Sequence, residues 1–173
     1  MRKFIFGITI IFTVLSCKYD KKDYLIKFYE GEFDEIGVPT GYLNSKGDTI
    51  VPIGKYNYCY TDTIRDFGMV IENETGKILG IDKNENELFE VFKTDNGPDY
   101  IENGLFRIVK NNKIGYANSN GKIVISPQYN CAHSFVQGKA KVSDSCETKT
   151  ASGQKCFFGT DWYFIDTKGN RIK

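Results

Sequence analysis

Apolar and polar residues alternate in short runs over most of the chain after residue 23, and Gly, Asn or Asp residues separate the runs. A period of two is typical of β-strands with one buried face. The pattern predicts strands over 25–29, 104–109 and 138–142, among others. No stretch after residue 17 combines a helical period with capping residues, so the chain is predicted to form an all-β domain.

One segment recurs along the chain. Residues 41–51 and 115–125 align without a gap, and residues 79–89 and 163–172 follow the same register. An Asn or Asp that bonds to its own backbone two residues on, followed by a glycine that accepts positive φ, is typical of a tight hairpin with a bulge. The predicted turn residues are Asn44, Gly47, Asp82, Asn118, Gly121, Asp166 and Gly169, with Glu85 at the glycine position of the second copy. The Asn/Asp positions are 38, 36 and 48 residues apart, which places an insertion in the last interval.

The third copy carries a recognisable set of residues, which comprises Ile114, Gly115, Tyr116, Pro127, Tyr129, Phe135, Gly138, Ala140 and Val142. This set resembles the WG (KWG-type) repeat family, and the resemblance extends over residues 37–173. The tryptophan of the repeat occurs only as Trp162, where Tyr163 follows instead of glycine. The resemblance implies tandem antiparallel β-hairpin repeats that form a twisted sheet or open barrel, in proteins that mostly bind a partner or present a surface.

The N-terminus has the layout of a signal peptide, because a short basic start is followed by an uncharged run over 4–15. Such a run would rise about 18 Å as a helix, less than the roughly 30 Å of a bilayer core, which argues against a membrane-spanning helix. Residues 14–17 resemble the lipobox of bacterial lipoproteins, in which Cys17 carries the lipid; ordinary signal cleavage is the alternative. We expect a lipoprotein signal peptide over 1–16, a lipidated tether over 17–23 and the repeat domain over 24–173, anchored at the periplasmic side or the cell surface of a bacterium.

The remaining cysteines form an even set once Cys17 is set aside. Cys146 and Cys156 flank the insertion, and in an oxidising compartment they would close it with a disulfide. Cys59 and Cys131 occupy non-equivalent places in their repeats, and we expect both to be buried free thiols.

Composition and residue spacing argue against nucleic-acid, metal and catalytic sites. The net charge is only +1, which argues against nucleic-acid binding. Cys131, His133, Cys146 and Cys156 could be drawn as a zinc set, but their spacing is not a known zinc pattern. Asp82 begins a sequence similar to a calcium loop that lacks the later glycine and glutamate. We expect no metal, no cofactor and no catalytic residue, since no nucleophile motif or phosphate loop occurs.

Aromatic side chains are the remaining candidates for ligand contact, and those we expect to face a ligand are Tyr58, Tyr60, Tyr100, Trp162 and Tyr163. The sequence therefore predicts a non-enzymatic extracytoplasmic lipoprotein that serves as a protein-binding or scaffold module of the cell envelope. Its expected partner is another envelope protein. The alternatives are a glycan-binding module, which needs exposed coplanar rings, and an envelope hydrolase, which needs two convergent carboxylates in a cleft.

Overall fold

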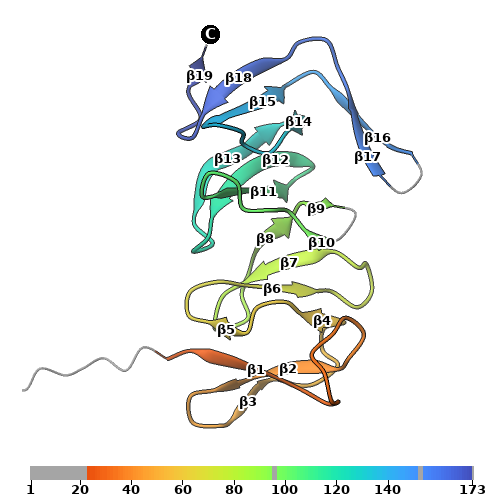
Figure 1. The fold of residues 1–173 in the computed structure, drawn as a ribbon, viewed down its shortest axis with the longest axis vertical. Helices are drawn as coiled ribbons and strands as arrows, with labels where there is room; N and C mark the ends of the chain where they lie inside the picture. Colours follow the sequence, from red (N-terminus) through yellow and green to blue (C-terminus); the bar gives the residue numbers. More distant parts are fainter. Residues whose placement is uncertain (1–22, 95–96, 152–153, 173) are drawn as a thin grey trace, which may run out of the picture.

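The computed structural model describes residues 23–94, 97–151 and 154–172. All of its strands are antiparallel, as predicted, and they form short sheets stacked along the long axis of the molecule (Figure 1). Within these described ranges no helix is long and apolar enough to cross a membrane. The predicted signal peptide and Cys17 lie outside the described residues.

Four meanders of three antiparallel strands form the repeat units, which we number along the chain. The first unit contains β1 (Leu25–Tyr29), β2 (Thr40–Asn44) and β3 (Thr49–Val51), and the second contains β6 (Gly68–Ile71), β7 (Ile78–Ile81) and β8 (Glu87–Val91). The third contains β11 (Leu105–Lys110), β12 (Lys113–Asn118) and β13 (Ile123–Tyr129), and the fourth contains β15 (Lys139–Ser143), β18 (Tyr163–Asp166) and β19 (Arg171–Ile172). Because the strands pair in the same way in each unit, a residue in one unit has a counterpart in the others.

Short strands connect the units. They are β4 (Tyr58–Cys59) and β5 (Thr63–Ile64) after the first unit, β9 (Lys93–Thr94) and β10 (Gly97–Pro98) after the second, and β14 (Cys131–Ala132) after the third. β8 also pairs with β11, so the second and third units share one sheet. The hairpin of β16 (Glu147–Ala151) and β17 (Gln154–Phe158) separates β15 from β18 and extends beside the stack (Figure 1). It occupies the insertion that the repeat spacing predicted.

The predicted turn residues form one kind of turn in all four units. The side-chain Oδ1 of the first turn residue accepts hydrogen bonds from the backbone N–H groups two and four positions on, at 2.7–3.1 Å, in Asn44, Asp82, Asn118 and Asp166. The residue three positions on has a positive φ in every unit, and these residues are Gly47, Glu85, Gly121 and Gly169. Each turn is therefore held by bonds within five consecutive residues.

Glu85 takes the glycine conformation in the second unit, with a φ of 61°. A side chain in the left-handed region costs about 1–2 kcal/mol relative to glycine. The Glu85 carboxylate forms an ion pair with Lys55 from the end of the first unit. The turn geometry is thus kept although the residue is less suited to it.

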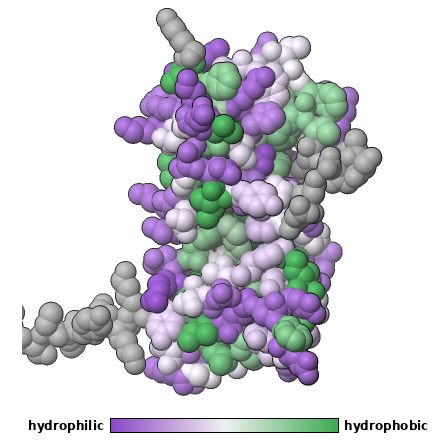
Figure 2. Space-filling view, in the orientation of Figure 1, coloured by the Kyte–Doolittle hydropathy of each residue, from purple (hydrophilic) through white to green (hydrophobic). Residues whose placement is uncertain are grey.

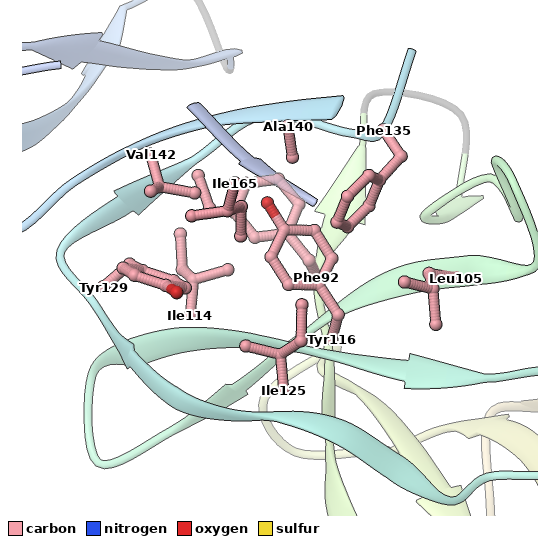
Figure 3. Packing of buried hydrophobic residues seen from close by; sticks show 11 residues of the cluster. Phe92, Leu105, Ile114, Tyr116, Ile125, Tyr129, Phe135, Ala140, Val142 and Ile165 are labelled. Atoms are coloured by element: carbon pink, nitrogen blue, oxygen red, sulfur yellow. The ribbon is translucent and has the colours of Figure 1, made fainter. Parts of the chain in front are cut away.

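Each junction between consecutive units encloses a hydrophobic cluster. Every unit therefore has a backward face, toward the preceding unit, and a forward face, toward the following one. The first junction buries Leu25, Tyr42, Val51, Cys59, Ile64, Val70, Leu79 and Ile81, and the second buries Ile78, Phe89, Val91, Phe106, Ile108 and Ala117. The third, shown in Figure 3, buries Phe92, Leu105, Ile114, Tyr116, Ile125, Tyr129, Ala132, Phe135, Ala140, Val142 and Ile165.

A buried ion pair supports the third unit. Arg107 Nη2 lies 2.5 Å from Asp99 Oδ1, and Arg107 Nε donates to Asp99 Oδ2 at 3.0 Å. The Asp99 side chain is 1% exposed and that of Arg107 10%. Arg107 also donates to the backbone oxygen of Ala132 at 3.2 Å, so the pair links this unit to the segment that follows it.

The structure corrects the predicted disulfide. Cys146 is bonded to Cys131, with a Cα–Cα distance of 5.9 Å, while Cys156 and the buried Cys59 are free. In the inserted hairpin Cys156 pairs with Lys149, three residues beyond Cys146. This offset corresponds to about 10 Å along the strand and places Cys146 and Cys156 on opposite sides of the hairpin, too far apart for a disulfide. The prediction of a free thiol was right for Cys59 and wrong for Cys131.

Candidate functional site

The C-terminal end of the stack carries an aromatic hollow of ≈ 540 Å³, lined by Trp162, Tyr163, Phe164, Arg171 and Ile172. It lies beside β18 and β19, at the end of the molecule where the chain terminus is marked in Figure 1. We call these five residues the C-terminal hollow.

The third strand is shorter in the fourth unit than in the third unit. There β13 runs along the whole of β12, so that Tyr129 pairs with Ile114 as well as Ile125 with Tyr116. In the fourth unit the pairs of β19 end at Ile172 opposite Phe164. The hollow therefore occupies the place that the second half of a longer third strand fills in the third unit.

Phe164 is the counterpart of Tyr42 and Tyr116 on the forward face. Both tyrosines are 0% exposed, whereas Phe164 is 45% exposed. The tyrosines are covered because the chain after their units folds back over them, and their hydroxyls donate to the backbone oxygens of Thr61 and His133 at 2.6 and 2.7 Å. Within the described part of the chain no segment does the same for Phe164, which also lacks a hydroxyl to bond.

Cations lie over the aromatic rings of the hollow. The Arg171 guanidinium carbon is 4.3 Å from the ring centroid of Tyr163, and Lys141 Nζ is 5.3 Å from that of Trp162. The Tyr163 hydroxyl donates to Asp144 Oδ2 at 2.9 Å. Partial burial and this hydrogen bond raise the pKa of Tyr163 to about 12, so its hydroxyl is a donor at physiological pH.

His133 also packs against Trp162, with its ring centroid 5.1 Å from the indole and 5.4 Å from that of Phe157. Burial, assisted by the charges of Arg107 and Lys141, lowers the pKa of His133, which favours the neutral ring. The disulfide ties up the cysteine two residues before it, so the zinc set considered from the sequence does not form.

Among the residues the structure describes, no three His, Cys, Asp or Glu side chains converge as they would around a metal ion. Asp82, the start of the calcium-like sequence, uses Oδ1 for its turn and accepts a bond from Asn86 Nδ2 on Oδ2 at 2.9 Å. Although partial burial opposes it, hydrogen bonds from Asn86 and Asn84 hold the pKa of the Asp82 carboxyl below its ordinary value. The carboxylate is thus committed to the turn.

The predicted ligand-facing aromatics fall into three groups. Tyr100 is 61% exposed, whereas Tyr60, Trp162 and Tyr163 are half-buried. Tyr58 is 7% exposed, which contradicts its prediction. It is buried because the loop between β1 and β2 covers β4, where Asp34 Oδ1 accepts a hydrogen bond from the Tyr58 hydroxyl at 2.9 Å.

Tyr100 belongs to a second exposed surface, which we call the loop surface. Its apolar members are Tyr100, Ile101 and Val136, which are 61%, 50% and 69% exposed. The loops that carry them are adjacent, since Gly138 N donates to Asn103 Oδ1 at 3.0 Å. Each loop closes in a two-residue turn with positive φ at both positions, over 103–104 and 137–138, so its backbone is well defined.

Sequence reasoning missed Phe164, Arg171 and Ile172 at the hollow and Ile101 and Val136 at the loop surface. The signal for Phe164 was in the register, because it aligns with Tyr42 and Tyr116, which the repeat places in a covered core. No signal in the sequence marks Val136, because its exposure depends on how two loops meet.

The stacked antiparallel meanders and their common turn define an all-β repeat protein. Residues 114–144 match the family model described as the WG containing repeat, from β12 of the third unit to β15 of the fourth. Residues 114–144 of the chain therefore carry a WG repeat. Comparison with curated proteins and with solved structures gave no significant match.

Proposed function

We propose that this chain is a non-enzymatic, extracytoplasmic lipoprotein that serves as a protein-binding or scaffold module of the bacterial cell envelope. The loop surface is the observation that carries the binding part of this proposal. Three exposed apolar side chains on two well-defined turns present little conformational freedom to lose on binding. Tyrosine in addition combines apolar area with a polar tip, as is common at the centres of protein interfaces.

The rings favour a protein partner over the alternative, a glycan. A sugar would stack on the open face of an aromatic ring. The guanidinium of Arg171 and the ammonium of Lys141 lie over Tyr163 and Trp162, and Tyr58 is buried. Of the predicted set Tyr100 is then the one residue that is more than half exposed, and Tyr60 is half-buried, which is fewer open rings than a stacking platform needs.

The carboxylates near the hollow do not resemble a hydrolytic pair. Asp144 and Asp161 line a neighbouring depression of ≈ 460 Å³, but both are exposed. Asp144 accepts a hydrogen bond from Tyr163, and Asp161 accepts one from Ser145 Oγ at 3.1 Å. An acid catalyst in glycoside hydrolysis is instead enclosed in an apolar pocket.

Cross-linking and co-purification from envelope membranes tests the binding part. We expect a reproducible protein partner with the native chain and its loss in a Tyr100→Ala, Val136→Asp variant. Val124→Asp, which changes an exposed apolar residue on β13, is the matched control and should keep the partner. Recovery of no protein, or equal loss in both variants, would overturn the proposal; binding on a glycan array would then support the alternative.

Membrane fractionation tests the anchoring part. Cys17 would carry two acyl chains, which together give stable anchoring where one chain does not. Replacing Cys17 by serine should move the protein from the membrane to the soluble fraction. Membrane association that survives this substitution would contradict the lipid anchor.

A further inference from the structure

The backward faces of the third and fourth units are buried against the unit that precedes each of them. In the third unit Phe106, Ile108 and Ala117 point toward the second unit, and in the fourth unit Ala140, Val142 and Ile165 point toward the third. All of them are 0–1% exposed. Burial of these positions is therefore the normal state of a unit within the stack.

The first unit presents the same face to solvent. Ile26 pairs with Leu43 as Phe106 pairs with Ala117, and Phe28 pairs with Gly41 as Ile108 pairs with Gly115. Ile26 is 44% exposed, and Phe28 and Leu43 are half-buried. This face, which we call the N-terminal face, is therefore more exposed than its counterparts in the third and fourth units.

The forward face of the fourth unit is also partly open, because Phe164 is 45% exposed and Ile172, which pairs with it, is half-buried. Among the described residues, the backward face of the first unit and the forward face of the fourth unit therefore have no neighbouring unit packed on them. Hydrophobic side chains are exposed near both ends of the molecule in Figure 2. A forward face and a backward face are the two surfaces that meet at every internal junction.

We propose that the C-terminal end of one copy binds the N-terminal face of a second copy, so that the chain assembles head to tail and continues the stack. In this arrangement Phe164 packs against Ile26 and Phe28, as Tyr116 packs against the fourth unit within one chain. The contact joins two different surfaces, so it leaves a free face at each end and allows more than two copies to add. This assembly goes beyond the proposed function and does not use the loop surface.

Charge at the two ends favours this pairing over contacts between like ends. Glu30 directly follows β1 at the alternate position after Ile26 and Phe28, and Lys141 pairs with Phe164 on the fourth unit; both charged side chains are exposed. Opposite charges at the rim of an apolar contact steer association and select orientation. Two N-terminal faces would place their Glu30 side chains near one another, which like-charge repulsion opposes.

The acidic side chains near the basic end are engaged within their own unit. Asp144 accepts a bond from Tyr163, Asp161 from Ser145, and Asp166 from its turn. Among the described residues neither Lys139 nor Lys141 forms an ion pair with these carboxylates, although Lys141 Nζ lies over the Trp162 ring. This assignment of charge is what the second experiment tests.

Site-directed cross-linking tests the contact in the full chain. Two differently tagged versions carry Ile26→Cys and Phe164→Cys, each with Cys156→Ser, and are treated together with a bismaleimide in native membranes. Both positions are about half exposed, so the substitutions leave the cores intact. We expect mixed dimers of the two versions and higher species when one chain carries both cysteines. A Val136→Cys version, on the exposed loop surface, is the control and should give none with Ile26→Cys.

Three results would overturn the proposal: dimers of two Ile26→Cys chains, dimers of two Phe164→Cys chains, or no product between copies. Cross-links to a different protein through Phe164→Cys would also overturn it while leaving the proposed binding function standing. Conversely, mixed dimers in a sample that recovers no other protein would support the assembly and contradict the loop surface as a binding site.

Charge reversal supplies a second, independent measurement. Lys141→Glu should lower the yield of mixed dimers about fivefold, and Glu30→Lys in the other copy should restore part of it. Lys46→Glu, in the turn between β2 and β3, is the control and should leave the yield of mixed dimers unchanged. Equal yields for all three variants, or a loss with Lys46→Glu, would show that the two ends do not meet as proposed.

Discussion

Replacing Cys146 by serine separates the disulfide of the structure from the one the sequence predicted. The bond joins residues at a sequence separation of 15. Closing a loop of this length restricts the unfolded chain by about 3 kcal/mol in the chain-entropy description. Cys146→Ser and Cys131→Ser should therefore each lower the free energy of unfolding by about 3 kcal/mol. For a domain of this size that corresponds to a loss of about 6–12 °C in Tm.

Denaturant unfolding under non-reducing conditions measures this difference, and Cys156→Ser is the matched control. The free energy of unfolding of Cys156→Ser should remain close to that of the native protein, because Cys156 forms no disulfide. A reducing agent should destabilise the native protein and leave Cys146→Ser unchanged. A non-reduced peptide map linking Cys146 to Cys156, or equal destabilisation by Cys156→Ser, would refute the reasoning.

Three further predictions concern the turns, the buried ion pair and the histidine. Gly121→Ala should lower the free energy of unfolding by about 2–3 kcal/mol, because Gly121 has a positive φ and an added Cβ would lie 2.6 Å from the Phe67 side chain. Gly47→Ala, which has the positive φ but open space around it, should lower it by about 1 kcal/mol. Equal losses for the two variants would contradict the clash. Asp99→Ala should cost about 3–5 kcal/mol in the same assay, since it leaves Arg107 buried without its counter-ion; a change below 1 kcal/mol would contradict a structural role. Burial and neighbouring positive charge hold the pKa of His133 below 6.5, so the unfolded chain binds the proton more readily and stability is lost as pH falls through 6.5. His133→Gln removes the only histidine of the sequence, so the denaturation midpoint should depend less on pH in this range. An unchanged dependence of the midpoint on pH would contradict the assignment to His133.

The turns could be predicted from sequence because all their determinants lie close together. Asn118 and its counterparts bond to backbone groups no more than four residues away, and the following residue needs a positive φ. Glu85 shows how strong this local preference is, because the turn forms without glycine. The all-β class and the insertion followed from the same local pattern.

The features that sequence reasoning missed depend on contacts between distant segments. Pairing of β14 with β15 places Cys131 opposite Ser143, and the chain then returns so that Cys146 reaches it. Tyr58 is buried by a loop that precedes it by 24 positions. Phe164 is exposed because no other segment of the described residues covers it. The residue types around Phe164 cannot show whether such a covering segment is present.

The inserted hairpin shows how this architecture can acquire new parts. β15 and β18 pair directly, with Ala140 opposite Ile165, although β16 and β17 separate them in sequence. The ends of the insertion therefore lie close together in space, and extra chain can loop out without disturbing the register on either side. Equivalent connections between first and second strands occur in every unit, so each is a place where natural variation, or a protein engineer, can graft a segment.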